Sequence, residues 1–247
     1  MTTPHRSDRH RWRSQLAAIV VAAAALAYAA ARAPTVVTPA TAQQPERPFG
    51  LPYAEPPGLA TWHLGQPYGN TTYAFAERGG LYASGQGMHM GLDLVAACGT
   101  PVVAIGDGVV LSVDGRGGSP PHNLMIEHAG GYISFYGHLI ERPFVAAGQA
   151  VTRGEPVGLT GDMNANCNGS PHLHLEIRDS SLGHAYNPIS LIDADWHGIA
   201  LLGPTALSFQ RDLDRPRQWQ SIDDQPQLDL GGPLLNEYAN AWPIAVE

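Results

Sequence analysis

The stretch Pro171-His172-Leu173-His174-Leu175-Glu176-Ile177 decides the fold that this sequence predicts. Side chains alternate between the two faces of a β-strand, so its two histidines and Glu176 would lie on one face. The two leucines and Ile177 would then face an apolar core. Two imidazoles on a strand with an apolar back can bind a metal ion, although a polar strand with incidental histidines has the same pattern.

Two further motifs carry residues that can bind metal. Gly87-Met88-His89-Met90-Gly91-Leu92-Asp93-Leu94 places a histidine and an aspartate four residues apart at the start of an apolar strand. Tyr136-Gly137-His138-Leu139 places another histidine at the end of an alternating strand. Two histidines and a carboxylate leave one position of a tetrahedral zinc ion open to water, as in a catalytic site. Each motif alone is weak, but together they indicate a metal site.

At these motifs the chain resembles the lysostaphin-type (LytM-like) zinc metallopeptidases, which cut peptide cross-links of bacterial peptidoglycan. The resemblance runs from about residue 85 to residue 191. Carried over residue by residue, it implies one zinc ion bound by His89, Asp93 and His174, with His138 and His172 as catalytic residues that do not bind the metal. The connecting segments match as well: Cys98-Gly99-Thr100-Pro101-Val102, Gly106-Asp107-Gly108-Val109-Val110, Gly148-Gln149-Ala150-Val151 and Asn187-Pro188.

One position departs from the family pattern. Some members carry an additional tyrosine six residues before the first ligand, where this chain has Ala83 beside Tyr82. Among the catalytic histidines, His172 shares a strand face with His174 and is our candidate general base. His138 would then stabilise the oxyanion or donate a proton, and the reverse assignment stays open. Glu176, on the same face, is a candidate for orienting a ligand imidazole.

The resemblance implies a zinc-dependent endopeptidase that hydrolyses peptidoglycan cross-links through a zinc-activated water, acting as a monomer. The alternative is a non-catalytic LytM-like protein that binds the wall and activates an amidase, but no residue of the catalytic set is missing. A lipoyl-like or phosphotransfer carrier with a similar β core would not explain Asp93. Zinc content separates the carrier from the other two, and turbidity loss of peptidoglycan separates enzyme from activator. Which peptide bond is cut does not follow from the sequence.

The fold class follows from short strands separated by turn residues, with no amphipathic helix between residues 92 and 178. This spacing indicates an all-β antiparallel sandwich or half-barrel. The resemblance implies a LytM/lipoyl-like core, a duplicated hybrid motif with few helices. The candidate strands are residues 92–95, 102–105, 109–113, 124–128, 132–136, 156–159 and 172–177.

The chain divides into four predicted parts. Residues 1–32 combine arginines with a charge-free run of 16 residues, which indicates a signal peptide or an N-terminal membrane anchor. Residues 33–58 are a Pro/Ala-rich linker, residues 59–195 the metallopeptidase domain and residues 196–247 an acidic C-terminal extension. Either interpretation of the first part predicts an exported, periplasmic or extracellular protein that meets a membrane only through an uncleaved segment.

Charge and the position of the extension limit the function further. Without residues 1–42 the chain has 9 arginines, no lysine and 21 acidic residues, a formal charge of −12. This balance argues against nucleic-acid binding. Scattered leucines in the extension favour its docking on the domain. All five candidate residues precede it, so we expect deletion of residues 200–247 to leave the zinc site intact.

The two cysteines, Cys98 and Cys167, are an even number in a chain that looks exported, which favours a disulfide. They lie in the loops that flank the strands with Asp93 and His172. If these strands are neighbours, a bond between the loops is geometrically reasonable. The alternative is a cysteine ligand to the metal. We assign the other histidines after residue 58 to structural or rim positions: His63, His122, His128, His184 and His197.

Overall fold

The computed structural model describes residues 47–115, 117–203, 209–211 and 219–237. The predicted signal or anchor at residues 1–32 and most of the predicted linker therefore lie outside the described residues. Within the described residues, no helix has the length and apolar character needed to cross a membrane.

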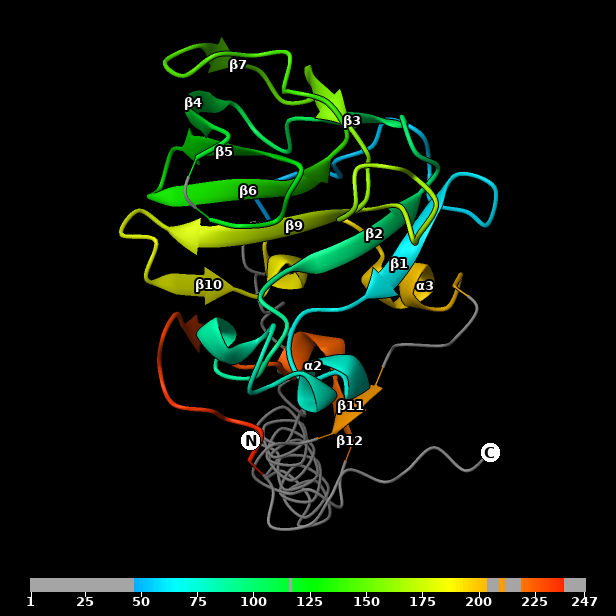
Figure 1. Ribbon diagram of the computed structural model, residues 1–247, viewed down its shortest axis with the longest axis vertical. Coiled ribbons are helices and arrows are strands. Elements are labelled where there is room, and N and C mark those ends of the chain that lie inside the picture. Colours follow the sequence, from blue (N-terminus) through cyan, green and yellow to red (C-terminus); the bar gives the residue numbers. More distant parts are fainter. Residues whose placement is uncertain (1–46, 116, 204–208, 212–218, 238–247) are drawn as a thin grey trace, which may run out of the picture. The chain divides into compact units, whose positions relative to one another are not determined.

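An antiparallel sheet of nine strands dominates the described part of the chain (Figure 1). Its strands run in the order β1-β2-β9-β6-β5-β4-β7, and β10 pairs with both β9 and β13. The strands are β1 (Trp62–Gln66), β2 (Leu92–Ala96), β4 (Gly108–Val113), β5 (His122–His128), β6 (Tyr132–Leu139), β7 (Ala150–Val151), β9 (His172–Asp179), β10 (His184–Tyr186) and β13 (Leu228–Asp229).

Smaller elements surround this sheet. Strands β3 (Pro101–Val103) and β8 (Pro156–Leu159) form a separate antiparallel pair, as do β11 (Phe209–Arg211) and β12 (Trp219–Ser221). In the described ranges the α-helices are short, α2 (Thr72–Ala76) and α3 (Trp196–Ala200). Thr71 caps α2, since its hydroxyl oxygen accepts a hydrogen bond from the backbone N–H of Ala74. The prediction of an antiparallel all-β fold with few helices is confirmed.

Strand β9 lies inside the sheet, between β2 and β6, and its leucines and isoleucine are fully buried on one face. Its other face carries the polar residues, as the alternation predicts. On one side of β9, Asp93 pairs with His174. On the other side, Gly137 pairs with the same histidine. The register therefore brings three motifs that are far apart in the sequence to one point of the sheet.

All seven predicted strands are present, with ends that differ by up to three residues. The short strands β10 and β13 were not predicted. They have three and two residues, too few for an alternating pattern to stand out from loop sequence.

Residues 47–58 contact the core, although the sequence predicted a linker up to residue 58. The backbone N–H of Phe49 donates to the carbonyl of Leu191 at 3.1 Å, and its carbonyl accepts from Asp193 at 2.9 Å. The Phe49 ring is 3% exposed and lies 4.9 Å from the His128 ring. The prolines of residues 47–58 indicated a linker, whereas single aromatic residues such as Phe49 anchor this stretch to the core. We propose that the packed unit includes Phe49.

Residues 222–236 form a segment that we call the C-terminal strap. Ile222 and Leu228 of the strap are fully buried in the main core, and so belong to the same packed unit as β9. Trp196 and Ile199 of α3 also lie in that core. Helix α3 and the strap are thus docked on the main core, as the apolar residues of the extension suggested.

Candidate metal centre

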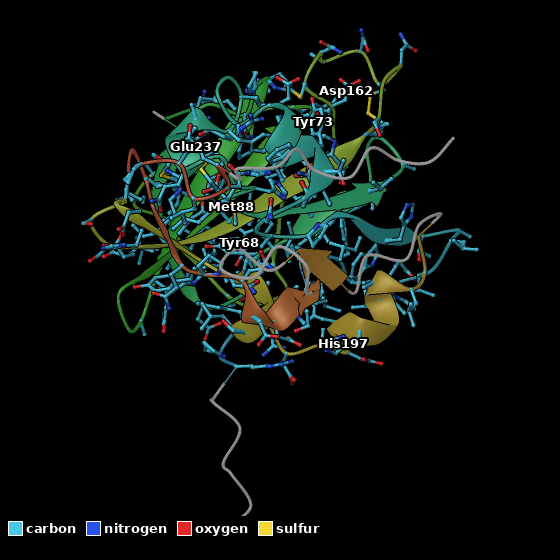
Figure 2. The ribbon with its side chains drawn as sticks, turned by 90° about the horizontal axis from the view of Figure 1, so that it is seen from below. Tyr68, Tyr73, Met88, Asp162, His197 and Glu237 are labelled. Carbon is cyan, nitrogen blue, oxygen red and sulfur yellow. A yellow bond between two sulfur atoms is a disulfide. The ribbon has the colours of Figure 1, made fainter. Side chains whose placement is uncertain are left out.

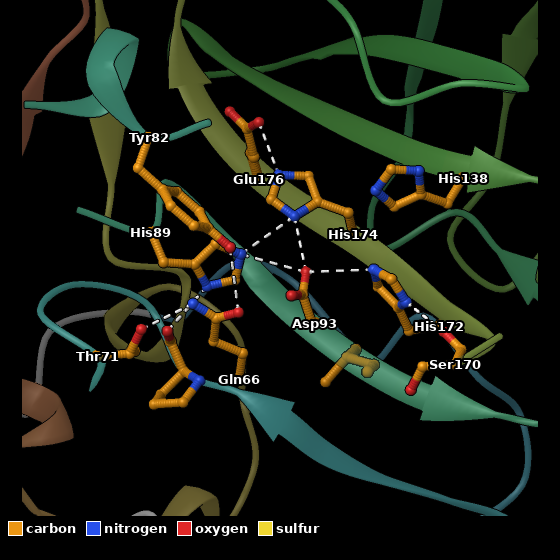
Figure 3. A network of polar contacts seen from close by, with 12 residues as sticks. Gln66, Thr71, Tyr82, His89, Asp93, His138, Ser170, His172, His174 and Glu176 are labelled. Atoms are coloured by element: carbon orange, nitrogen blue, oxygen red, sulfur yellow. Dashed lines mark hydrogen bonds and ion pairs between the residues drawn. The ribbon is translucent and has the colours of Figure 1, made fainter. Parts of the chain in front are cut away.

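His89, Asp93 and His174 converge where β2 pairs with β9 (Figure 3). Nε2 of His89 lies 3.2 Å from Oδ1 of Asp93 and 3.2 Å from Nδ1 of His174. That Nδ1 lies 2.8 Å from the same carboxylate oxygen. Among the described residues this is the one group of three histidine, cysteine or acidic side chains whose ligand atoms lie within 4.8 Å of one another.

The donor set fits zinc. Two imidazole nitrogens and one carboxylate oxygen are ligands that catalytic zinc sites use, with a fourth position left for water or substrate. The two histidines are buried and Asp93 is only partly exposed. The three donor side chains are therefore surrounded mostly by protein. The residues that the sequence proposed as ligands are therefore together and could hold a metal ion.

Local contacts fix the ring of His89. The residue lies shortly before β2, which begins at Leu92, and its backbone forms an isolated antiparallel bridge with Gly69. Its Nδ1 donates a hydrogen bond to the carbonyl oxygen of Pro67 at 2.9 Å. Because that nitrogen carries the proton, Nε2 is left with a lone pair for a metal ion.

The ring of His174 is fixed by a buried chain of polar residues along the same face of β9. Its Nε2 donates to Oε1 of Glu176 at 2.9 Å, and Oε2 of Glu176 accepts from Nε of Arg178 at 2.6 Å. The guanidinium also lies 5.1 Å from the centre of the Phe135 ring. The sequence pointed to Glu176 but not to Arg178, which is the next residue on that face.

Burial and charge oppose each other at this centre. Burial raises the pKa of Asp93, but the neighbouring His89 and His174 outweigh it and hold that pKa well below its usual range. Burial likewise raises the pKa of Glu176, and hydrogen bonding to His174 together with the charge of Arg178 lowers it to about 2. Burial lowers the pKa of His174, but hydrogen bonds to Asp93 and Glu176 raise it to about 10. At neutral pH the metal-free centre therefore holds two carboxylate anions next to the protonated His174 and to Arg178.

His138 and His172 stand beside the three donors. Their rings are 4.8 Å apart, and Nε2 of His172 lies 3.9 Å from Oδ1 of Asp93. In each ring Nδ1 donates to a backbone carbonyl at 2.7 Å, that of Pro120 for His138 and that of Ser170 for His172. In each ring, Nε2 is therefore the nitrogen that remains available to accept or donate a proton.

The backbone of His138 is unusual. Its φ of +58° lies in the left-handed region, which residues other than glycine rarely adopt. The backbone is crowded there, since a Cβ on Gly161 would lie 2.6 Å from the His138 carbonyl oxygen. Such conformations persist where the surrounding structure enforces them, often at functional sites. No pattern in the sequence indicated this conformation.

Two hollows meet at the centre and share Asp93 and His172. One, of about 180 Å³, lies towards β6 and contains all five candidate residues. Exposed apolar side chains form part of its lining: Tyr73, Leu81 and Met163. The other, of about 350 Å³, lies towards β1 and is lined by more polar residues, among them His63, Gln66 and Ser170. The first hollow is lined by the end of β6 and by the segment between β1 and β2, and the second by β1, β2 and the start of β9.

Tyr82 faces the same centre. Its ring lies 5.8 Å from that of His89, and its hydroxyl donates to Oε1 of Gln66 at 3.2 Å (Figure 3). Burial, and then the charge of Asp93, raise the pKa of this phenol. Tyr82 thus supplies an aromatic hydroxyl to the hollow, whereas residue 83 has no such group.

Cys98 and Cys167 form a disulfide, with their Cα atoms 5.8 Å apart. The described residues contain no free cysteine, so neither sulfur serves as a metal ligand. Asp162 organises the loop of Cys167, since its carboxylate accepts from the backbone N–H groups of Asn164, Asn166 and Gly169.

The remaining described histidines contact groups other than the three donors or line the second hollow. His122 pairs with Asp114 at 2.9 Å, and His197 pairs with Asp223 at 2.7 Å. His128 bonds Ser134 at 2.7 Å. His184 contacts Asp229 of the strap, and His63 lines the second hollow.

Fold and donor set describe an antiparallel β domain with a candidate metal site. Residues 87–188 match the model of peptidase family M23, and this segment of the chain belongs to that family. The resemblance to the lysostaphin-type (LytM-like) peptidoglycan metallopeptidases, proposed from the motifs, is thereby confirmed.

Similar proteins share this segment. The chain is 37% identical over 103 residues to an uncharacterized metalloprotease of Haemophilus influenzae, covering 42% of this chain and 21% of that protein. It is 38% identical over 104 residues to the DD-carboxypeptidase/endopeptidase Mpg of Neisseria meningitidis, covering 42% and 23%. The match spans about a fifth of the length of these relatives. A zinc containing peptidase from Vibrio cholerae is similar in structure, with a TM-score of 0.44 and 26% identity over 61% of this chain and 41% of that one.

Proposed function

We propose that this chain is a zinc-dependent endopeptidase that hydrolyses peptide cross-links of bacterial peptidoglycan, outside the cytoplasm. The observation that carries the proposal is the convergence of His89, Asp93 and His174, with ligand atoms within 4.8 Å, in a hollow that also contains His138 and His172. Membership of the segment in peptidase family M23 supports a peptidase, and similarity to the peptidoglycan DD-endopeptidase ShyA of Vibrio cholerae supports a cell-wall substrate.

Each side chain has a role in this proposal. His89, Asp93 and His174 would hold one zinc ion, which when bound supplies a Lewis acid and lowers the pKa of a coordinated water. His172 and His138 would move protons, because each keeps one ring nitrogen beside the donors. We assign His172 as general base, since its Nε2 is 3.9 Å from Asp93. Tyr82 offers a hydroxyl that can hydrogen-bond the substrate.

Alanine variants of the five residues test the division of roles. His89→Ala, Asp93→Ala and His174→Ala should lose zinc and activity together, because each removes a ligand. His138→Ala and His172→Ala should keep near-stoichiometric zinc and lose about 10²–10⁴-fold in rate, the usual contribution of general acid–base catalysis. Metal analysis and turbidity loss of purified peptidoglycan measure the two quantities.

The Leu59→Ala variant, at a side chain that is 78% exposed, is the control and should keep both zinc and activity. Loss of zinc from the His172 variant with zinc retained by the His174 variant would reverse the assignment of the two strand histidines. Wild-type protein that binds zinc but releases nothing from peptidoglycan would instead support a wall-binding activator of an amidase. Mass spectrometry of the released muropeptides identifies the bond that is cut.

A further inference from the structure

The C-terminal strap, residues 222–236, contacts the segment that carries His89. That segment runs from residue 67 to residue 89, and its two ends are joined by the bridge between Gly69 and His89. In the bridge each backbone N–H donates to the other residue's carbonyl oxygen at 2.9 Å. The carbonyl that fixes the His89 ring, that of Pro67, belongs to the same segment.

Gln225 of the strap contacts the first end of this segment, residues 68–70. The backbone N–H of Asn70 donates to Oε1 of Gln225 at 2.9 Å. A Cβ on Gly69 would lie 2.3 Å from the same oxygen, so the amide packs directly on the glycine. The fully buried Tyr68, which lies in the interior in Figure 2, donates from its hydroxyl to the carbonyl of Pro226 at 2.9 Å.

The strap contacts the second end of the segment at Gln86 and Gly87. Oε1 of Gln86 accepts from the backbone N–H of Asp229 at 2.7 Å, and its Nε2 donates to the carbonyl of Pro233 at 2.9 Å. Its own carbonyl accepts from Leu235 at 2.9 Å. The side-chain amide of the fully buried Asn236 donates to the carbonyl of Gly87.

We propose that the strap positions the first metal ligand, so that strap contacts set the affinity of the centre for zinc. Between these two ends, the α-helix of the segment is α2. A helix of five residues is too short to be stable alone. Without the strap, ordering His89 would cost conformational entropy on metal binding. The inference rests on the proposed function, since it concerns the ion which that function requires. The contacts argue against the expectation that deleting residues 200–247 leaves the site intact.

Point variants of the full chain test this. Gln225→Ala and Asn236→Ala each remove a side-chain hydrogen bond between the strap and the segment of His89. Zinc affinity is measured by competition with a chelator under conditions where circular dichroism shows folded protein. Loss of contacts around a ligand typically weakens metal binding by about 10–100-fold, and we expect at least the lower value. Gln227→Ala, exposed and two residues from Gln225, is the matched control. Val151→Ala in β7 controls for general destabilisation.

The two controls should keep zinc affinity to within about twofold. Wild-type affinity in both strap variants would overturn the proposal. A second measurement does not depend on any variant, because coupling between two sites is reciprocal. Zinc should slow hydrogen exchange at the amides of Asn70, Asp229 and Leu235 in the wild type. If zinc protects only β2 and β9, strap and metal are uncoupled and the proposal is wrong. Wild-type protein that binds no zinc would contradict the proposed function itself.

Discussion

Each of the four histidines at the centre has one ring nitrogen engaged by the protein. Three donate from Nδ1 to backbone carbonyls and one donates from Nε2 to a carboxylate, so the protein selects the nitrogen that faces the centre. A fixed ring orientation lowers the entropy that metal or substrate binding must offset. The pairs are His89 with Pro67, His138 with Pro120, His172 with Ser170 and His174 with Glu176.

His128 should make the fold sensitive to acid. Burial lowers its pKa below 6.5, against the carbonyl and charge of Asp107, which raise it. The unfolded chain therefore binds this proton more readily than the folded one. The stabilisation is fully present above pH 6.5 and is lost as the pH falls towards the folded-state pKa. His128→Gln should flatten this part of the curve, as measured by urea unfolding at stepped pH values.

The control for this prediction is Leu59→Ala, since that side chain is 78% exposed and does not titrate. Its curve should follow that of the wild type. If the His128 variant keeps the wild-type slope in that interval, other groups are responsible for the acid sensitivity.

At the scale of elements, the disulfide joins the loop after β2 to the loop before β9, over a separation of 69 residues. Closing a loop of this length removes about 4 kcal/mol of chain entropy from the unfolded state in the usual model. A Cys98→Ser/Cys167→Ser variant should lose up to about that much stability in urea unfolding and should still bind zinc.

Two outcomes would contradict the disulfide prediction. Titration of two free thiols in the native, unreduced protein would show that the bond is absent in solution. Zinc loss in the folded double variant would show that the bond supports the ligands directly.

The sequence predicted β9 well, because a strand buried on one face shows strict alternation over its length. It also placed the five candidate residues together, since motif spacing and family resemblance agreed. It did not predict the strap, whose contacts with Gln86 and Gly87 use backbone groups and single amide side chains. It missed the backbone of His138, since a left-handed residue other than glycine is imposed by tertiary contacts. Such features have no periodic signature.

At the scale of the whole described unit, Phe49 connects distant parts of the chain. Its backbone joins residues 191 and 193, and its ring packs on His128 and Tyr132. Phe49→Ala should cost about 3–5 kcal/mol, the usual range for removing a buried phenylalanine side chain. Urea unfolding measures this.

Phe144→Ala is the matched control, because that ring is 55% exposed, and it should change stability by less than about 0.5 kcal/mol. Equal stability of the two variants would mean that residues 47–58 behave as a linker after all.

Asp93 and His172 line both hollows, so the centre lies on a floor that continues in two directions. A substrate chain of the proposed peptidase that lay across both hollows would extend past the scissile bond on both sides. Such a chain would not need to enter the site by its terminus. The proposed substrate, peptidoglycan, is cross-linked into a network with few free ends. A peptidase that binds its substrate in this way would reach internal bonds of that network.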